Sequence, residues 1–243
     1  MNSTFMFGED RFGDAEDFFE TYQALGGDML DRSAVNSAIR RCYEGMSGDY
    51  EDPSRIDDFP SLEEGLRNYA NAESADLPLL EAVFAHHERG RVPPEFAACL
   101  RRLSLSHGLG VVSNIWARKD PWLAEFASAG IGDIWDTVVF SSDGRSMKPS
   151  PRLFRQAIDA FDLPLSEIVF VGDSLRVDVV PAKSIGLDTV WICPNAQRHP
   201  LANLVVRSLL ELETVPADSR LDTDTPRRST SSLKVWQDTQ GKM

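Results

Sequence analysis

Five polar residues of this sequence are of types that together handle a phosphate group and a hard cation: Ser113, Asn114, Lys148, Asp173 and Asp178. Mg²⁺ takes oxygen ligands and keeps several waters, so one or two carboxylates and a substrate phosphate are enough to hold it. A lysine ammonium offsets the charge of a phosphoryl group during transfer. A serine hydroxyl and backbone N–H groups at a helix N-terminus bind phosphate oxygens. These types therefore favour phosphate chemistry with Mg²⁺.

Each of these residues has an ordinary role when it is considered alone. Ser113 would be a loop hydroxyl, and Lys148, which precedes a proline, would be a solvated lysine. Asp173 would be a helix N-cap, and Asp178 would be an acid in a first helical turn, stabilised by the helix dipole. The joint pattern outweighs these roles, because a hydroxyl, a cation and two acids follow successive apolar runs.

The sequence after Arg91 alternates between short apolar runs and longer amphipathic stretches. This alternation predicts a parallel sheet covered on both faces, which is a doubly wound α/β fold with right-handed crossovers. Ligands of such sheets bind beyond the carboxyl ends of the strands, where Ser113 and Asp173 fall. We expect strands within 108–114, 135–143, 166–174 and 188–193, and helices within 93–108, 120–130, 150–161, 176–186 and 199–212.

Residues 14–90 have a different character and contain helical patterns without a convincing strand. Ser61 with Glu64 three residues later fits a capping box, and Gly90 fits a C′ residue that ends a helix. The polar, turn-rich residues 48–60 are predicted to form a loop. The four expected helices lie within 14–27, 31–46, 61–72 and 77–90.

The two ends of the chain carry weaker patterns. "STFMF" at residues 3–7 is the stub of a strand. From about Pro216 onward the sequence is polar and aperiodic, which predicts a disordered tail. The expected organisation is an N-terminal stub (1–13), a helical part (14–92), an α/β core (93–215) and a tail (216–243).

Charge and composition limit the kinds of partner that this protein is expected to bind. Residues 1–90 carry 20 acidic and 7 basic side chains, whereas residues 91–243 carry 18 of each. Such acidity argues against a nucleic-acid partner, because a phosphate backbone needs a basic face. No apolar run reaches the length of a membrane span, and the first residues are not those of a secretory signal. Three well-separated cysteines fit buried thiols in a reducing cytoplasm. The oligomeric state is left open.

Three stretches of the sequence resemble the haloacid dehalogenase (HAD) superfamily of hydrolases: "VVSN", "KPSPRLF" and "VFVGDSLRVDVVPAKSIGLDTVWI". The resemblance extends over roughly residues 14–212, with the motifs in the family's order. It implies that Ser113 and Lys148 are catalytic, that both bind substrate together with Asn114, and that Asp173 and Asp178 hold the metal. It also implies a HAD-like Rossmannoid core, with residues 14–92 as an inserted α-helical cap that selects the substrate.

The resemblance implies a Mg²⁺-dependent phosphatase that acts on a small phosphorylated metabolite. Asp173 favours a phosphatase over a dehalogenase, because the dehalogenase branch of the family tends to carry a neutral residue in its place. A phosphomutase relative remains an alternative. A receiver-type signalling domain fits less well, because receivers place their acids early and their lysine late.

One motif of the family is missing where the resemblance expects it. The first motif is a strand that ends in Asp-x-Asp and supplies a nucleophile, but no Asp-x-Asp follows "STFMF". Glu9 and Asp10 are adjacent, so the alternation of a strand would point them in different directions. We therefore expect this chain to have little turnover. The alternative function is that of a non-catalytic HAD-like protein that binds a phosphorylated ligand or a partner.

Overall fold

A parallel β-sheet forms the centre of the structure, a computed structural model that describes residues 1–214 and 234–239. Within these residues the sheet has six strands in the order β2-β1-β6-β3-β4-β5, and all neighbouring strands are parallel. The predicted α/β class is thereby confirmed. The strands span Leu109–Ser113 (β1), Trp135–Phe140 (β2), Ile168–Gly172 (β3), Asp188–Ile192 (β4), Leu204–Val206 (β5) and Lys234–Thr239 (β6).

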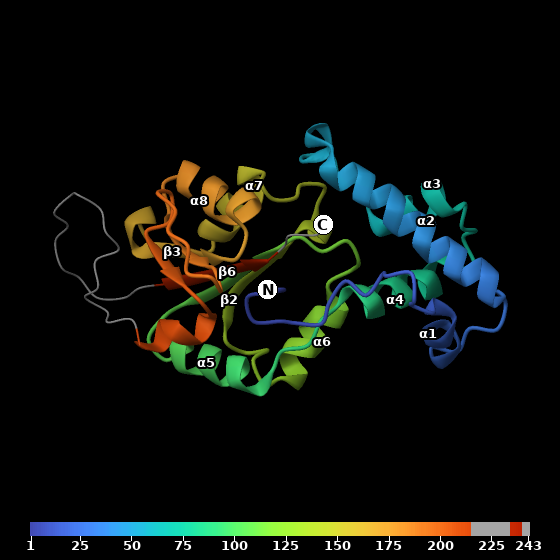
Figure 1. Cartoon of the computed structure of the whole chain (residues 1–243), viewed down its shortest axis with the longest axis horizontal. Coiled ribbons are helices and arrows are strands. Elements are labelled where there is room, and N and C mark those ends of the chain that lie inside the picture. The colour runs from blue at the N-terminus through green and yellow to red at the C-terminus, as the bar shows by residue number, and fades with distance from the viewer. Residues whose placement is uncertain (215–233, 240–243) are drawn as a thin grey trace.

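Helices cover both faces of the sheet, with α7 and α8 on one side and α5 and α6 on the other (Figure 1). Consecutive residues of β1 serve opposite faces, because side chains alternate along a strand. Val112 belongs to one apolar cluster with Phe154 of α7, whereas Val111 belongs to a second cluster with Leu100 of α5. The apolar character of β1 follows from these two covered faces. The helices span Pro94–Ser104 (α5), Asp120–Ser128 (α6), Pro151–Ile158 (α7) and Val180–Ser184 (α8).

Four α-helices lie within residues 14–90, all of which the structure describes, and they pack together beside the α/β core (Figure 1). Ser61 and Glu64 form the predicted capping box. Helix α2 continues to Glu51, into the segment predicted to be a loop, because Tyr50 is buried against Phe59 and Trp116. The helices span Phe18–Ala24 (α1), Arg32–Glu51 (α2), Leu62–Ala70 (α3) and Leu77–Glu88 (α4).

The N-terminal residues form turns in place of the expected strand stub. The strand-type pairing described for "STFMF" consists of two isolated bridges, Met6 with Asn2 and Phe7 with Arg91. Gly90 is the C′ residue of α4, as predicted, because it directly follows the C-cap residue Arg89, but its φ is not positive. A Cβ on Gly90 would come within 2.7 Å of the carbonyl oxygen of Phe7. Glycine is therefore required where the two connections to the helical part run side by side.

The strand β6 comes from the C-terminal segment and lies between β1 and β3 (Figure 1). Its register pairs Thr239 with Ser113 of β1, and Asp238 with Gly172 of β3. The polar pattern of residues 216–243 predicts a disordered tail, and the structure differs from this prediction at the six residues Lys234–Thr239. Without β6, the facing edges of β1 and β3 would lack backbone partners, which favours any segment able to pair with both. Residues 215–233 and 240–243 lie outside the described part.

The predicted closing helix over residues 199–212 is wrong. Leu204–Val206 instead forms the edge strand β5, and Leu209–Thr214 forms a 3₁₀ helix. Cys193 donates its backbone N–H to the carbonyl of Val206 (2.7 Å), which extends the pairing of β5 with β4. The periodicity of a short apolar run does not distinguish a helix from a strand. Here the run forms a strand, because it pairs with the otherwise open edge of β4.

All three cysteines are buried and none forms a disulfide, as the sequence analysis predicts. Burial raises the pKa of the Cys42 thiol and of the Cys99 thiol to about 12, so both stay protonated at neutral pH. Among the described residues, none of the helices combines the length and the apolar character that crossing a membrane requires.

Candidate active site

Ser113 and Asn114 end the strand β1 at the carboxyl edge of the sheet, and both are buried. Gly172 ends β3 at the same edge, and Asp173 follows it directly. Because β6 lies between β1 and β3, the two strand ends are about 10 Å apart. The sheet therefore brings these sequence-predicted residues to one edge, as the strand pattern predicts.

A buried ion pair joins two of the predicted residues. The ammonium of Lys148 lies 2.9 Å from Asp178 Oδ1, and neither side chain is exposed. The other oxygen of Asp178, Oδ2, accepts the backbone N–H of Ser174 (2.9 Å). Burial lowers the pKa of Lys148, and the negative charge of Asp178 opposes this change. The pair thus offers a positive charge whose position is fixed by the protein.

The turn after β3 places Asp178 in this pair. Leu175–Val179 forms a π-helical turn, in which the backbone N–H groups of Asp178 and Val179 both bond to the carbonyl of Ser174. The turn folds Asp178 back over the strand end, and a Cβ on Gly172 would come within 2.6 Å of the Asp178 carboxylate. Only glycine allows this approach. The Gly-Asp spacing in the sequence therefore has a direct structural reason.

Asp173 is half-buried at the same edge. Its Oδ1 accepts the hydroxyl of Thr4 (3.3 Å), and its backbone carbonyl accepts the indole N–H of Trp191 (2.8 Å). Burial, and next the nearby charge of Asp178, raises the pKa of Asp173 to about 7. This side chain gains its negative charge only near neutral pH, which is unusual for an aspartate.

The carboxamide of Asn114 is held by the backbone of Lys148. Lys148 N–H donates to Asn114 Oδ1 (2.7 Å), and Asn114 Nδ2 donates to the Lys148 carbonyl (3.1 Å). The same Nδ2 lies 3.3 Å from the hydroxyl of Tyr50 on α2. The Asn114 side chain therefore sets the position of the Lys148 backbone, and its predicted contact with the substrate stays a prediction.

Three residues outside the predicted site contact the loop after β1: Ser141, Glu88 and Tyr50. Ser141 bonds to both backbone groups of Ile115, since its hydroxyl donates to the carbonyl (2.8 Å) and accepts the N–H (3.0 Å). Glu88 accepts the N–H groups of the next two residues along this loop. Tyr50 is the third. Glu88 had one signal in the sequence, since an acid at a helix C-terminus opposes the helix dipole.

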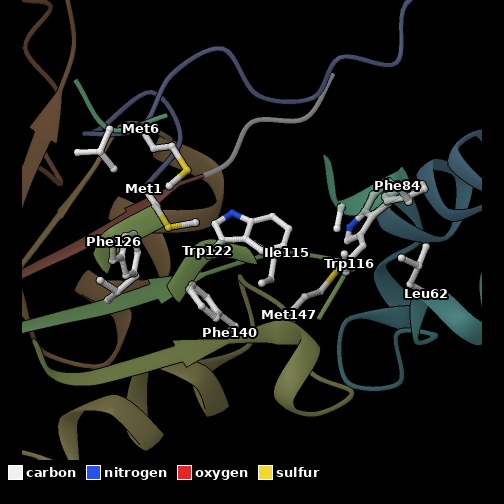
Figure 2. Close-up of a cluster of buried hydrophobic side chains, with 14 of the residues drawn as sticks. Met1, Met6, Leu62, Phe84, Ile115, Trp116, Trp122, Phe126, Phe140 and Met147 are labelled. Carbon is white, nitrogen blue, oxygen red and sulfur yellow. The ribbon is translucent and has the colours of Figure 1, made fainter. Parts of the chain in front are cut away.

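The helical part and the core share an apolar cluster at this edge. Trp116 follows β1 but packs among aromatic side chains of the helical part, and Figure 2 shows it near Phe84 and Leu62. The ring centroid of Trp116 lies 5.8 Å from that of Phe59 and 6.1 Å from that of Phe84. Trp116 also lines a cavity of about 140 Å³ between the helical part and the loops after β1 and β2. Trp116 and Trp122 are both buried.

Polar contacts join a second pair of loops across the same boundary. Asp57 accepts the hydroxyl groups of Ser150 (2.6 Å) and Ser146 (3.0 Å). The backbone N–H of Phe59 donates to the carbonyl of Arg145 (2.8 Å). These bonds hold the loop before α3 against the loop that precedes Lys148. The helical part is therefore docked on the two loops that carry Asn114 and Lys148.

The carboxylates of the site fit a divalent cation. Within the described residues, no group of three or more His, Cys, Asp and Glu side chains gathers in a way that could hold a metal ion. Mg²⁺ does not need such a group, because it commonly uses one or two carboxylates with waters and phosphate oxygens. A cation beside Asp173 would also offset the burial that raises its pKa. Each oxygen of Asp178 already accepts one hydrogen bond and retains a second lone pair that could bind a cation. The role of Asp178 as a metal ligand stays a prediction.

We expect the pH dependence of stability to reveal Asp173. Its folded pKa of about 7 lies above its ordinary value of 3.8, so the proton on Asp173 stabilises the folded state. This contribution is complete below about pH 4 and is lost as the pH rises through 7. Relative to Asp173→Asn, the free energy of unfolding of the wild type should fall by on the order of 2 kcal/mol between pH 5 and pH 8. Urea denaturation of both proteins measures it, and parallel profiles would contradict the assignment.

The fold and this site define a class: a doubly wound α/β protein with a helical unit at the carboxyl edge of its sheet and a buried lysine–aspartate pair there. The model of the haloacid dehalogenase-like hydrolases matches residues 14–186. The chain belongs to this family.

Similar proteins agree with this assignment. The chain is 26% identical over 183 residues to a glyceraldehyde 3-phosphate phosphatase of Pyrococcus abyssi, covering 68% of this chain and 73% of that protein. It is 32% identical over 132 residues to a phosphoserine phosphatase of Thermus thermophilus, covering 53% and 51%. A HAD phosphatase structure from Thermococcus onnurineus matches with a TM-score of 0.54 and 25% identity, over 82% of this chain and 86% of that one. A 2-haloacid dehalogenase structure from Pseudomonas syringae matches with a TM-score of 0.61 and 22% identity, over 87% and 93%, which shows the fold alone.

Proposed function

We propose that this chain carries the site of a Mg²⁺-dependent phosphatase for a small phosphorylated metabolite. The observation that carries the proposal is the buried Lys148–Asp178 pair with Asp173 beside it at the carboxyl edge of the sheet. One fixed positive charge and two carboxylates suit a phosphate group and its metal ion. The phosphatase names of the similar proteins support the same reading. A reducing cytoplasm suits the three buried thiols.

The residues of the site take the following roles in this proposal. Ser113 and the backbone N–H groups after β1 bind phosphate oxygens, and Asn114 holds the loop of Lys148 in place. Lys148 offsets the charge of the phosphoryl group, and Asp178 fixes its ammonium. Asp173 is the principal metal ligand, with Asp178 as the second. When bound, Mg²⁺ would polarise the phosphoryl oxygens and offset their charge. Residues 14–92 are the cap that selects the substrate.

Ligand binding tests the proposal without requiring turnover. At pH 8, above the pKa of Asp173, we expect calorimetry to detect Mg²⁺ binding to the wild type and phosphate binding in the presence of Mg²⁺. Asp173→Asn should weaken Mg²⁺ binding on the order of 100-fold. Asp143→Asn is the matched control, because Asp143 follows the strand β2 and pairs with Lys119 (2.8 Å), which is not among the proposed site residues. Equal Mg²⁺ affinity in the wild type and Asp173→Asn would contradict the proposal.

A non-catalytic role is the second candidate, and one observation favours it. The hydroxyl of Thr4 bonds to Asp173, and buried residues of the same N-terminal segment, Met1 and Phe5, lie in the adjoining core. No Asp-x-Asp follows this segment to supply the nucleophile of the family. The chain would then bind a phosphorylated ligand or a partner through Lys148 and Asp173 without cleaving it.

Turnover separates the two candidates. We expect hydrolysis of p-nitrophenyl phosphate with Mg²⁺ to be on the order of a thousandfold slower than in an active phosphatase of this family, because a covalent step lacks its nucleophile. Robust turnover that is lost in Asp173→Asn would show that the nucleophile is present.

A further inference from the structure

Glu88 is a buried carboxylate at the boundary between the helical part and the core. It is the last residue of α4 and is only 1% exposed. Its Oε1 accepts the backbone N–H of Trp116 (2.7 Å), and its Oε2 accepts that of Ala117 (2.9 Å). Each oxygen of one carboxylate thus takes one of two consecutive N–H groups, 28 and 29 residues further along the chain.

The position of Glu88 is unfavourable unless these bonds compensate it. The C-terminal end of a helix carries partial negative charge, which disfavours an acid there. Burial of a carboxylate adds a further cost. Two charge-assisted hydrogen bonds from backbone N–H groups offset both effects, and such bonds are among the stronger ones in proteins. The contact therefore fixes the end of α4 and the loop after β1 relative to each other.

This loop begins at the proposed phosphate-binding residues. Ser113 and Asn114 precede Ile115, whose backbone is held by Ser141 of the core. Glu88 holds the next two residues, and the side chain of Trp116 packs against Phe84 of the same helix α4 (Figure 2). The first half of the loop is thus fixed by the core, whereas the second half is fixed by the helical part.

We propose that Glu88 is a positioning residue that couples the placement of the helical part to the phosphate-binding loop at residues 113–117. It acts through the two N–H groups and does not touch the substrate itself. Movement of α4 relative to the sheet would pull on Trp116 and Ala117 and would shift the backbone at Asn114. The effect on phosphate binding rests on the proposed function, whereas the effect on the loop does not.

Hydrogen–deuterium exchange tests the coupling in the ligand-free chain. Glu88→Gln keeps one acceptor oxygen but turns an NH₂ group toward the second N–H, so one of the two bonds is lost. We expect the amides of Trp116 and Ala117 to exchange on the order of tenfold faster in this variant, with unchanged exchange in β3. Glu81→Gln is the matched control, because Glu81 lies on the same helix but its partner is the exposed Arg118 side chain (3.4 Å). Wild-type exchange in Glu88→Gln would overturn the proposal.

A second variant and a second measurement complete the test. Should Glu88→Gln fail to fold, Glu88→Asp retains the charge but shortens the side chain, and it should also speed exchange at Trp116 and Ala117. In calorimetry at saturating Mg²⁺, Glu88→Gln should weaken phosphate binding on the order of tenfold and leave Mg²⁺ affinity unchanged. Equal phosphate affinity in the wild type and Glu88→Gln would contradict the coupling. If the wild type binds no phosphate, the proposed function fails, and the exchange experiment still decides the role of Glu88.

Discussion

Lys148→Met should destabilise the protein by about 3–5 kcal/mol, because it leaves the fully buried carboxylate of Asp178 without its cation. The ammonium of Lys148 is 2.9 Å from Oδ1 of that carboxylate, and Oδ2 accepts the backbone N–H of Ser174. A single N–H cannot compensate a buried negative charge. Urea denaturation at pH 7, read by circular dichroism, measures the free energy of unfolding.

Two further variants make the Lys148 experiment specific. Lys119→Met removes a lysine from the pair with Asp143, whose side chains are 45% and 26% exposed, so its loss should cost less than about 1 kcal/mol. The double variant Lys148→Met/Asp178→Asn removes both charges and should recover part of the lost stability, since no unpaired buried ion remains. If Lys148→Met unfolds at the same urea concentration as Lys119→Met, the buried pair does not exist in solution.

A chain that ends at Thr214 should lose its cooperative thermal transition, or unfold at a temperature lower by on the order of 10 °C or more. This truncation removes β6 from the centre of the sheet, where it pairs in register with five residues of β1 and five residues of β3. Its loss leaves the facing edges of both strands without backbone partners. Differential scanning calorimetry compares the shortened chain with the full chain.

The control for this truncation is a chain that ends at Thr239. It keeps β6 and lacks only residues 240–243, so we expect the transition of the full chain. Retention of the same transition in the chain that ends at Thr214 would show that β6 does not complete the sheet in solution. The sheet would then have to close between β1 and β3 in another way.

Local patterns predicted most of the α/β core. Buried strands such as Ile168–Gly172 are short apolar runs with covered faces. In the helical part, the Ser61–Glu64 capping box is a clear start signal for α3. The edge strand Leu204–Val206 was predicted as part of a helix, because its apolar run is too short for periodicity to decide. The strand Lys234–Thr239 was predicted to be disordered, because its own composition does not indicate burial.

In the site, too, some features could be predicted from local patterns and others could not. Strand ends alone place Ser113 and Asp173 at one edge of the sheet, because parallel strands present their carboxyl ends together. The spacing of Asp173 and Asp178 does not reveal the π-helical turn that directs Asp178 to Lys148, nor the role of Gly172 in allowing that approach. The roles of Glu88 and Ser141 are even harder to predict from the sequence, because each residue belongs to one element and binds the backbone of a loop that follows another element, β1.

The sequence by itself determined the α/β class, the helical character of residues 14–90 and the residue types that meet at the carboxyl edge of the sheet. These features depend on side-chain periodicity and on strand direction, which are local properties. Only the tertiary structure decided that β6 fills the centre of the sheet, that Lys148 pairs with Asp178, and that Glu88 holds the loop after β1. These contacts join residues far apart in the chain, and they form because buried backbone groups and buried charges must find partners.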